Sequence, residues 1–169
     1  EPVETVEVEI SAAVEKTEKE EAKPAVMQLQ VAATKMIEAH QGFSRWVHVA
    51  PDGKTIVSCG NDKLVKVWSA KKMKLRQDCV GHERHPWAVM IHPNGQELVS
   101  EDIMGEIIVW GLKNGKQRSK IDASVMTGFD LKFQADMGGA RAMAFNQDGT
   151  LLGCAGTTNV VNAFAGQQD

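Results

Sequence analysis

The sequence predicts an all-β fold made of repeated four-stranded antiparallel sheets. The run VHVAPDG at 47–53 recurs 42 residues later as VMIHPNG at 89–95, and each run alternates apolar and polar residues before a glycine turn. The composition of the 169 residues, 43% hydrophobic and 24% charged, is that of an ordinary globular protein with enough chain for one domain. A repeat of this length with these turns favours one small β unit per copy.

The first repeat, about residues 40–80, begins with a strand in which Val47 and Val49 alternate with His48. The Asp52-Gly53 pair predicts a hairpin turn, because glycine readily takes positive φ. The run LVKVW at 64–68 then predicts a further strand, rich in β-branched residues.

The second repeat, about residues 81–123, keeps the same register, since EIIVW at 106–110 falls on LVKVW. A third repeat, 136–169, follows an insertion at about 124–135 and contains MAFNQDG at 143–149. A period of about 40 to 45 residues predicts one four-stranded blade per repeat. The predicted fold is therefore a partial or incomplete β-propeller.

At these residues the chain resembles the WD-repeat β-propeller family, over residues 40 to about 156, as a segment of a larger bacterial-type WD-repeat protein. The resemblance implies a structural set of His, Ser or Thr, Asp and Trp in each complete blade, joined by hydrogen bonds. The first repeat has all four residues: His40, Ser58, Asp62 and Trp68. The second repeat keeps three of them, His82, Ser100 and Trp110, but has Met104 at the Asp position, so we expect a less rigid second blade. The third repeat has Asp136, Cys154, Thr158 and Phe164 at these positions.

Three repeats do not complete a ring, because a propeller closes with roughly four to eight blades. The sequence leaves three arrangements open: a segment of a longer chain, a ring of several copies, or an excerpt whose open faces meet another subunit. In the family an amino-terminal strand often completes the last blade, and residues 31–39 are our candidate for that strand.

Charge is distributed unevenly along the chain. Residues 1–24 contain eight Glu and three Lys and predict an acidic flexible linker, although the alternation of Val6, Val8 and Ile10 is also compatible with a strand. We place the propeller segment at 25–169. A net charge of −3 disfavours a nucleic-acid partner, and no apolar run approaches the roughly 18 residues of a membrane helix. We therefore expect a soluble protein, cytoplasmic or periplasmic, with no membrane partner.

No common catalytic or phosphate-binding motif occurs in the sequence, so we expect no enzyme activity, no cofactor and no metal. Cys79, His82 and His85 have the spacing that could begin a zinc site, but His82 already has a role in the repeat. The carboxylates of Glu101-Asp102 and Glu106 are expected to be solvated.

The candidate partner-binding surface comes from two places in the repeat scheme. One position near the start of the first strand in each repeat holds Arg45, Trp87 and Arg141, which we expect to cluster. Phe129 and Phe133, in the insertion, could add a contact patch. We predict a non-catalytic scaffold that binds a protein or peptide, with further blades from the same chain or other subunits. The alternative is the accessory propeller of a multidomain enzyme or electron-transfer protein whose reactive domain lies outside this chain.

Overall fold

The computed structural model describes residues 9–11, 30–32, 35–130, 135–157, 160–162 and 165–166. The chain divides into two compact units, 1–38 and 39–169. In the first unit, β1 (Glu9–Ser11) pairs antiparallel with β2 (Gln30–Ala32). Of the candidate closing strand at 31–39, residues 31–32 belong to β2, residues 33–34 lie outside the described residues and residues 35–39 form no strand, so its role in completing a blade stays a prediction. Apart from 9–11, the predicted linker at 1–24 lies outside the described residues.

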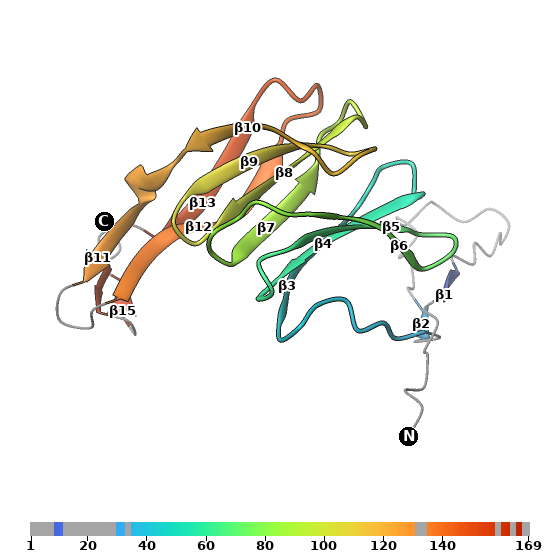
Figure 1. The fold of residues 1–169 in the computed structure, drawn as a ribbon, viewed down its shortest axis with the longest axis horizontal. Coiled ribbons are helices and arrows are strands. Elements are labelled where there is room, and N and C mark those ends of the chain that lie inside the picture. The colour runs from blue at the N-terminus through green and yellow to red at the C-terminus, as the bar shows by residue number, and fades with distance from the viewer. Residues whose placement is uncertain are drawn as a thin grey trace, which may run out of the picture. The chain divides into compact units, whose positions relative to one another are not determined.

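The first repeat folds into a four-stranded antiparallel sheet, blade 1, as predicted. Its strands are β3 (Ser44–Val49), β4 (Thr55–Gly60), β5 (Val65–Ser69) and β6 (Lys74–Cys79), in that spatial order (Figure 1). The turns between consecutive strands contain residues with positive φ, Gly53 at 66°, Lys63 at 66° and Met73 at 48°.

The second repeat forms blade 2 with the same topology. It consists of β7 (Pro86–Ile91), β8 (Glu97–Asp102), β9 (Glu106–Gly111) and β10 (Gln117–Asp122). Its turns take positive φ at Gly95, Gly105 and Gly115, each 42 residues after the corresponding position in blade 1. The repeat therefore specifies the turn conformations as well as the strands. In blade 2 all three positive-φ positions are glycine, which takes positive φ without steric cost.

The third repeat departs from the expected four-stranded blade. After the 3₁₀ turn η1 (Ser124–Met126), the strands β11 (Thr127–Asp130), β12 (Ala135–Phe145) and β13 (Leu152–Thr157) form a three-stranded sheet. The insertion supplies β11, because β12 is long enough to pair with β13 through Gly139–Phe145 and with β11 through Ala135–Gly138. A separate pair follows, β14 (Val160–Asn162) with β15 (Ala165–Gly166). Thr158 and Phe164 lie outside the described residues.

Apolar side chains fill the junctions between successive sheets. Between blades 1 and 2, Val57 and Val67 pack with Val89, Ile91 and other buried residues of blade 2. A second cluster joins blade 2 to the third sheet and contains Ala88, Val99, Ile107 and Met143. This face-to-face stacking, visible in Figure 1 as sheets placed side by side, covers both faces of blade 2 over β7, β8 and β9, whereas β10 is exposed. Within the described part of the chain, no helix is long and apolar enough to span a membrane.

Candidate functional site

Blade 1 contains a buried chain of hydrogen bonds that ties its turns to its strands. His40 Nε2 lies 2.8 Å from Ser58 Oγ, which also accepts the indole N–H of Trp68 at 2.9 Å. On the other side of the ring, His40 Nδ1 lies 2.8 Å from Asp62 Oδ1. Gly60 leaves room for the imidazole, since a Cβ at this position would lie 2.5 Å from His40 Cγ. These contacts join the residues of the structural set predicted for this blade.

The order Ser58, His40, Asp62 matches the hydrogen-bond order of a Ser-His-Asp catalytic triad. The residue Ser58, however, is buried, and its oxygen accepts the N–H of Trp68. A nucleophile needs an accessible oxygen beside the substrate, so this arrangement stabilises the blade rather than carrying out acyl transfer.

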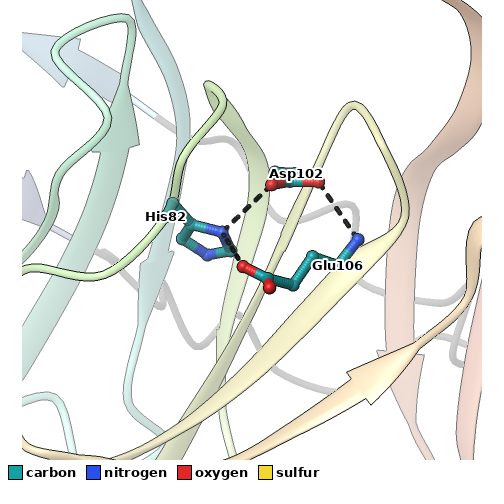
Figure 2. Close-up of side chains that lie close together, drawn as sticks. All are labelled: His82, Asp102 and Glu106. Carbon is teal, nitrogen blue, oxygen red and sulfur yellow. Dashed lines mark hydrogen bonds and ion pairs between the residues drawn. The ribbon is translucent and has the colours of Figure 1, made fainter.

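Blade 2 has the same hydrogen bonds among Trp, Ser and His, and a carboxylate from a different position lies beside its histidine. Ser100 Oγ lies 2.6 Å from His82 Nε2 and accepts the N–H of Trp110 at 2.8 Å. Asp102 Oδ2 lies 3.4 Å from His82 Nδ1 (Figure 2). A carboxylate therefore lies beside His82 although Met104 stands at the Asp position, but His82 Nδ1 is buried without a hydrogen-bond partner, and the expectation of a less rigid blade stays a prediction. Asp102 occupies the register position of Gly60 in blade 1, two residues before the predicted one.

Asp102 also holds the turn between β8 and β9. Its Oδ1 accepts the backbone N–H of Met104 at 2.9 Å and that of Glu106 at 3.1 Å. Burial by itself raises the pKa of Asp102, but His82 and the two backbone N–H groups outweigh it and lower the pKa below its usual value. The same balance of burial against His40 and backbone donors lowers the pKa of Asp62. Both aspartates therefore favour the charged form in the folded protein.

The expectation of solvated carboxylates is wrong for Glu101 and Asp102, which are 0% and 2% exposed. Side chains of a strand between two stacked sheets are covered on both faces, so sequence neighbours that point apart can both be buried. Both carboxylate oxygens of Glu101 lack a hydrogen-bond partner. Burial raises the pKa of Glu101, opposed by the nearby Cys154 thiol and Ala140 N–H.

Among the described residues, one cluster has donor atoms close enough to hold a metal ion. The ligand atoms of His82, Asp102 and Glu106 all lie within 4.8 Å of one another, with His82 Nδ1 3.9 Å from Glu106 Oε1 (Figure 2). Glu106 also pairs with Lys120 at 2.7 Å, so a cation already neutralises this carboxylate. Because His40, the equivalent of His82 in blade 1, is hydrogen-bonded directly to an aspartate, we interpret the cluster as part of the structural set of the blade.

The zinc alternative weighed for Cys79, His82 and His85 gains no support from the thiol. Cys79 is buried at the end of β6, and burial, with a smaller contribution from Asp78, raises the pKa of its thiol to about 12. A zinc ligand must be the thiolate, which this environment disfavours.

The structure brings Arg45, Trp87 and Arg141 together at one surface. The Cζ atom of Arg45 lies 4.1 Å from the centroid of the Trp87 ring, and the Cζ atom of Arg141 lies 4.7 Å from it. Arg45 and Trp87 are half-buried, whereas Arg141 is exposed. Both contacts fall within the range of cation–π attraction. We call these three residues the bulge site.

Each member of the bulge site is the extra residue of a β-bulge. The pairing register skips Arg45 between β3 and β4, Trp87 between β7 and β8, and Arg141 between β12 and β13. An extra residue turns its side chain out of the regular alternation of the strand, and such bulges commonly re-aim side chains near functional sites. Three equivalent bulges therefore direct side chains from three consecutive sheets to the same place.

Asn61 holds Arg45 in position. Its Oδ1 accepts the Nε–H of Arg45 at 2.6 Å, and its own backbone N–H donates to the carbonyl oxygen of Phe43 at 2.9 Å. The neighbouring residue Asp62 holds His40, so one turn supports both the buried framework and the surface. The sequence reasoning missed Asn61, because no repeat or motif marks it; Ile103 occupies its position in blade 2.

The insertion's contact patch remains a prediction. Phe129 lies on β11, but its side chain is outside the described residues, and Phe133 is outside them altogether.

Comparison with known proteins identifies WD repeats. The family model described as "WD domain, G-beta repeat" matches residues 32–69. "Small ribosomal subunit protein RACK1y" of Oryza sativa subsp. japonica is 35% identical over 91 residues, covering 53% of this chain and 27% of that protein. "Small ribosomal subunit protein RACK1" of Neurospora crassa is 35% identical over 89 residues, covering 50% and 28%. The solved structure named "Structure of U3-55K" is 22% identical, with a TM-score of 0.48 over 51% of this chain and 28% of that one.

The chain thus spans little more than a quarter of the length of these two curated relatives. They come from a plant and a fungus, so they give no support to the expected bacterial-type origin. The family match, both relatives and the two four-stranded blades agree with the predicted resemblance. Residues 32–69 thus match a WD repeat, and about half of the chain is similar to the two RACK1 proteins.

Proposed function

We propose that this chain is a non-catalytic interaction module that holds a protein or peptide partner at the bulge site. The observation that carries the proposal is the convergence of Arg45, Trp87 and Arg141 from three bulges in three consecutive sheets. Arginine and tryptophan are the residue types most enriched where protein partners bind tightly. A regular strand pairing would not turn these side chains out of the ladder at this position.

The names of the two relatives support a role within an assembly. Both are named as proteins of the small ribosomal subunit, which is a complex of many components. A module that works in such a setting needs a surface for its neighbours and no reactive group of its own. The buried positions of Ser58 and Ser100 agree with this, since their oxygens are occupied by the framework.

Further blades are a second class of partner in this proposal. Val47 and Val49 are 64% and 52% exposed on β3, whereas their equivalents Val89 and Ile91 are buried against blade 1. A preceding blade, from the same chain or from another subunit, would cover Val47 and Val49 in the same way.

A comparison of three immobilised proteins tests the binding role. The wild type, an Arg45→Gln/Arg141→Gln variant and a Lys71→Gln/Lys72→Gln control are used to capture partners from extract, with quantitative mass spectrometry. The control loses the same charge from exposed turn residues of blade 1. We expect a set of proteins held by the wild type and by the control but lost from the Arg variant. Equal capture by all three proteins would refute the bulge site as the binding surface.

A further inference from the structure

We propose that the bulge site recognises an anionic group, a carboxylate or a phosphoryl group, on an acidic peptide segment of the partner. This inference rests on the proposed function and specifies the chemistry of its partner. It begins from the charges: two guanidinium groups lie against one indole ring, at 4.1 Å and 4.7 Å from its centroid. In the described part of the chain, no carboxylate forms an ion pair with Arg45 or Arg141.

Two neighbouring cations repel each other, and the repulsion is strongest where a ring and the blade backbone exclude water from one side. An anion that contacts both guanidinium groups offsets this repulsion and gains attraction to each. Trp87 thus keeps the positive charges of Arg45 and Arg141 beside one ring, and a bound anion would stabilise this arrangement.

The free hydrogen-bond donors fit such an anion. Asn61 accepts the Nε–H of Arg45, and among the described residues no hydrogen bond engages the two terminal amino groups of that guanidinium. Arg141 is exposed, so its donors reach solvent. Guanidinium groups bind the oxygens of carboxylates and phosphates in pairs, with short charge-assisted bonds.

Trp87 gives the site its order before any ligand binds. The ring attracts both cations through its π face and limits the conformations of two long side chains. Asn61 restricts Arg45 further. Because this ordering is present in the free protein, binding costs less conformational entropy than at a pair of mobile surface arginines.

A peptide fits these observations better than a nucleic acid. Nucleic-acid surfaces gather many basic residues to follow a phosphate backbone, and a chain with a net charge of −3 lacks that excess. Two arginines and one aromatic ring match one or two acidic groups on a short segment, with the ring contacting the intervening chain.

Fluorescence polarisation with labelled ten-residue peptides tests the inference on the full chain. The probes are a glutamate-rich peptide, a phosphoserine peptide, a glutamine-substituted neutral peptide and a single-stranded RNA oligomer. Unlabelled inorganic phosphate serves as a competitor. We expect one or both acidic peptides to bind with an affinity that falls as salt rises, and the neutral peptide to bind at least about tenfold more weakly. The stronger acidic probe identifies carboxylate or phosphoryl as the source of charge.

Variants show whether binding uses the bulge site. Arg45→Gln/Arg141→Gln and Trp87→Leu should each lower the affinity about tenfold or more, whereas Lys71→Gln/Lys72→Gln should stay within about twofold. Arg45→Lys keeps the charge but loses the fork of donors, so an intermediate affinity is expected. A thermal unfolding midpoint equal to that of the wild type identifies the variants that remain folded. If Trp87→Leu does not fold, Arg45→Lys replaces it as the test of the bulge site.

The outcomes separate this inference from the proposed function. If no acidic peptide binds, but protein capture still depends on Arg45 and Arg141, the anionic chemistry is wrong and the interaction role stands. If the capture of proteins does not depend on these arginines, both the anionic ligand and the proposed binding role of the bulge site are wrong. Tighter binding of the RNA oligomer, with the same dependence on the arginines, would overturn the peptide as ligand.

Discussion

At the scale of single residues, Asp102 shows that the carboxylate beside a blade's histidine can come from a different position of the repeat. Blade 1 places its carboxylate at Asp62, in the turn, and leaves space for His40 with Gly60. Blade 2 has Asp102 at the position of Gly60, and this side chain reaches His82 and the turn N–H groups of Met104 and Glu106. Residue 104, which is equivalent to Asp62, therefore need not be an aspartate, and it is Met104 in this chain.

Removal of Asp102 should therefore destabilise the protein far more than removal of Met104. Asp102→Ala removes the acceptor of two partly buried backbone N–H groups and the carboxylate beside His82, which should lower the free energy of unfolding by about 3 kcal/mol. Met104→Ala is expected to cost less than about 1 kcal/mol. Urea denaturation of the two variants measures both values, and equal losses would contradict the role given to Asp102.

Two turn residues of blade 1 have backbone conformations that favour glycine. Lys63 and Met73 have φ of 66° and 48°, and blade 2 has Gly105 and Gly115 at these positions. Since the left-handed region costs a residue with a Cβ roughly 1 kcal/mol, Lys63→Gly and Met73→Gly should each stabilise the protein by up to about 1 kcal/mol. Differential scanning calorimetry checks the thermal midpoints. Gly105→Ala is the reverse control and should lower the midpoint, because its Cβ would lie 2.6 Å from the carbonyl oxygen of Ala123.

Some of these residues could be assigned from the sequence and others could not. The repeat predicts equivalent His, Ser and Trp residues in two blades, because an unbroken 42-residue register places them at equivalent points of a sheet, and hydrogen bonds join the three in each blade. The repeat did not predict the position of Asp102, because side chains from two different positions of a blade can both reach its histidine. The bulges at Arg45, Trp87 and Arg141 were equally invisible, because a bulge is defined by the partner strand.

At the scale of elements, the turns and strand order of blades 1 and 2 follow from the sequence, whereas the third sheet does not. The insertion supplies β11, which pairs with the first part of β12. The unpaired backbone groups of a long strand favour an additional strand at its edge. Nothing in the alternation of the insertion distinguishes such a strand from a covering loop.

The junction between blade 2 and the third sheet contains an unpaired carboxyl group, Glu101. Because its folded-state pKa is raised above the usual value, its ionisation disfavours folding, and the cost grows as pH rises above about 4.3. Glu101→Gln should therefore raise the free energy of unfolding at pH 7 by about 1 kcal/mol and change it little below pH 4. Thermal unfolding across this pH range measures the difference. Glu83→Gln, at an exposed position, is the control, and a benefit of Glu101→Gln that persists unchanged at low pH would contradict the argument.

At the scale of the whole molecule, blades stabilise one another by stacking, so equivalent residues should differ in importance according to their neighbours. Val89 is 0% exposed between blades 1 and 2, whereas its equivalent Val47 is 64% exposed on blade 1. Val89→Ala should cost about 2 kcal/mol and Val47→Ala less than about 0.5 kcal/mol in this chain. Chemical denaturation compares the two. Because both changes remove the same atoms from equivalent strands, similar costs would mean that the stacking described here does not stabilise the protein.

The same stacking aligns three bulges and creates the bulge site, which is the central claim. Its most direct test is an NMR titration of the full chain with the tighter-binding acidic peptide, following the Nε–H signals of Arg45 and Arg141 and the indole N–H signal of Trp87. We predict that all three signals shift together along one binding curve, while the buried indole signals of Trp68 and Trp110 stay in place. Shifts confined to one sheet, or absent from all three residues while the peptide binds elsewhere, would contradict the existence of one shared site.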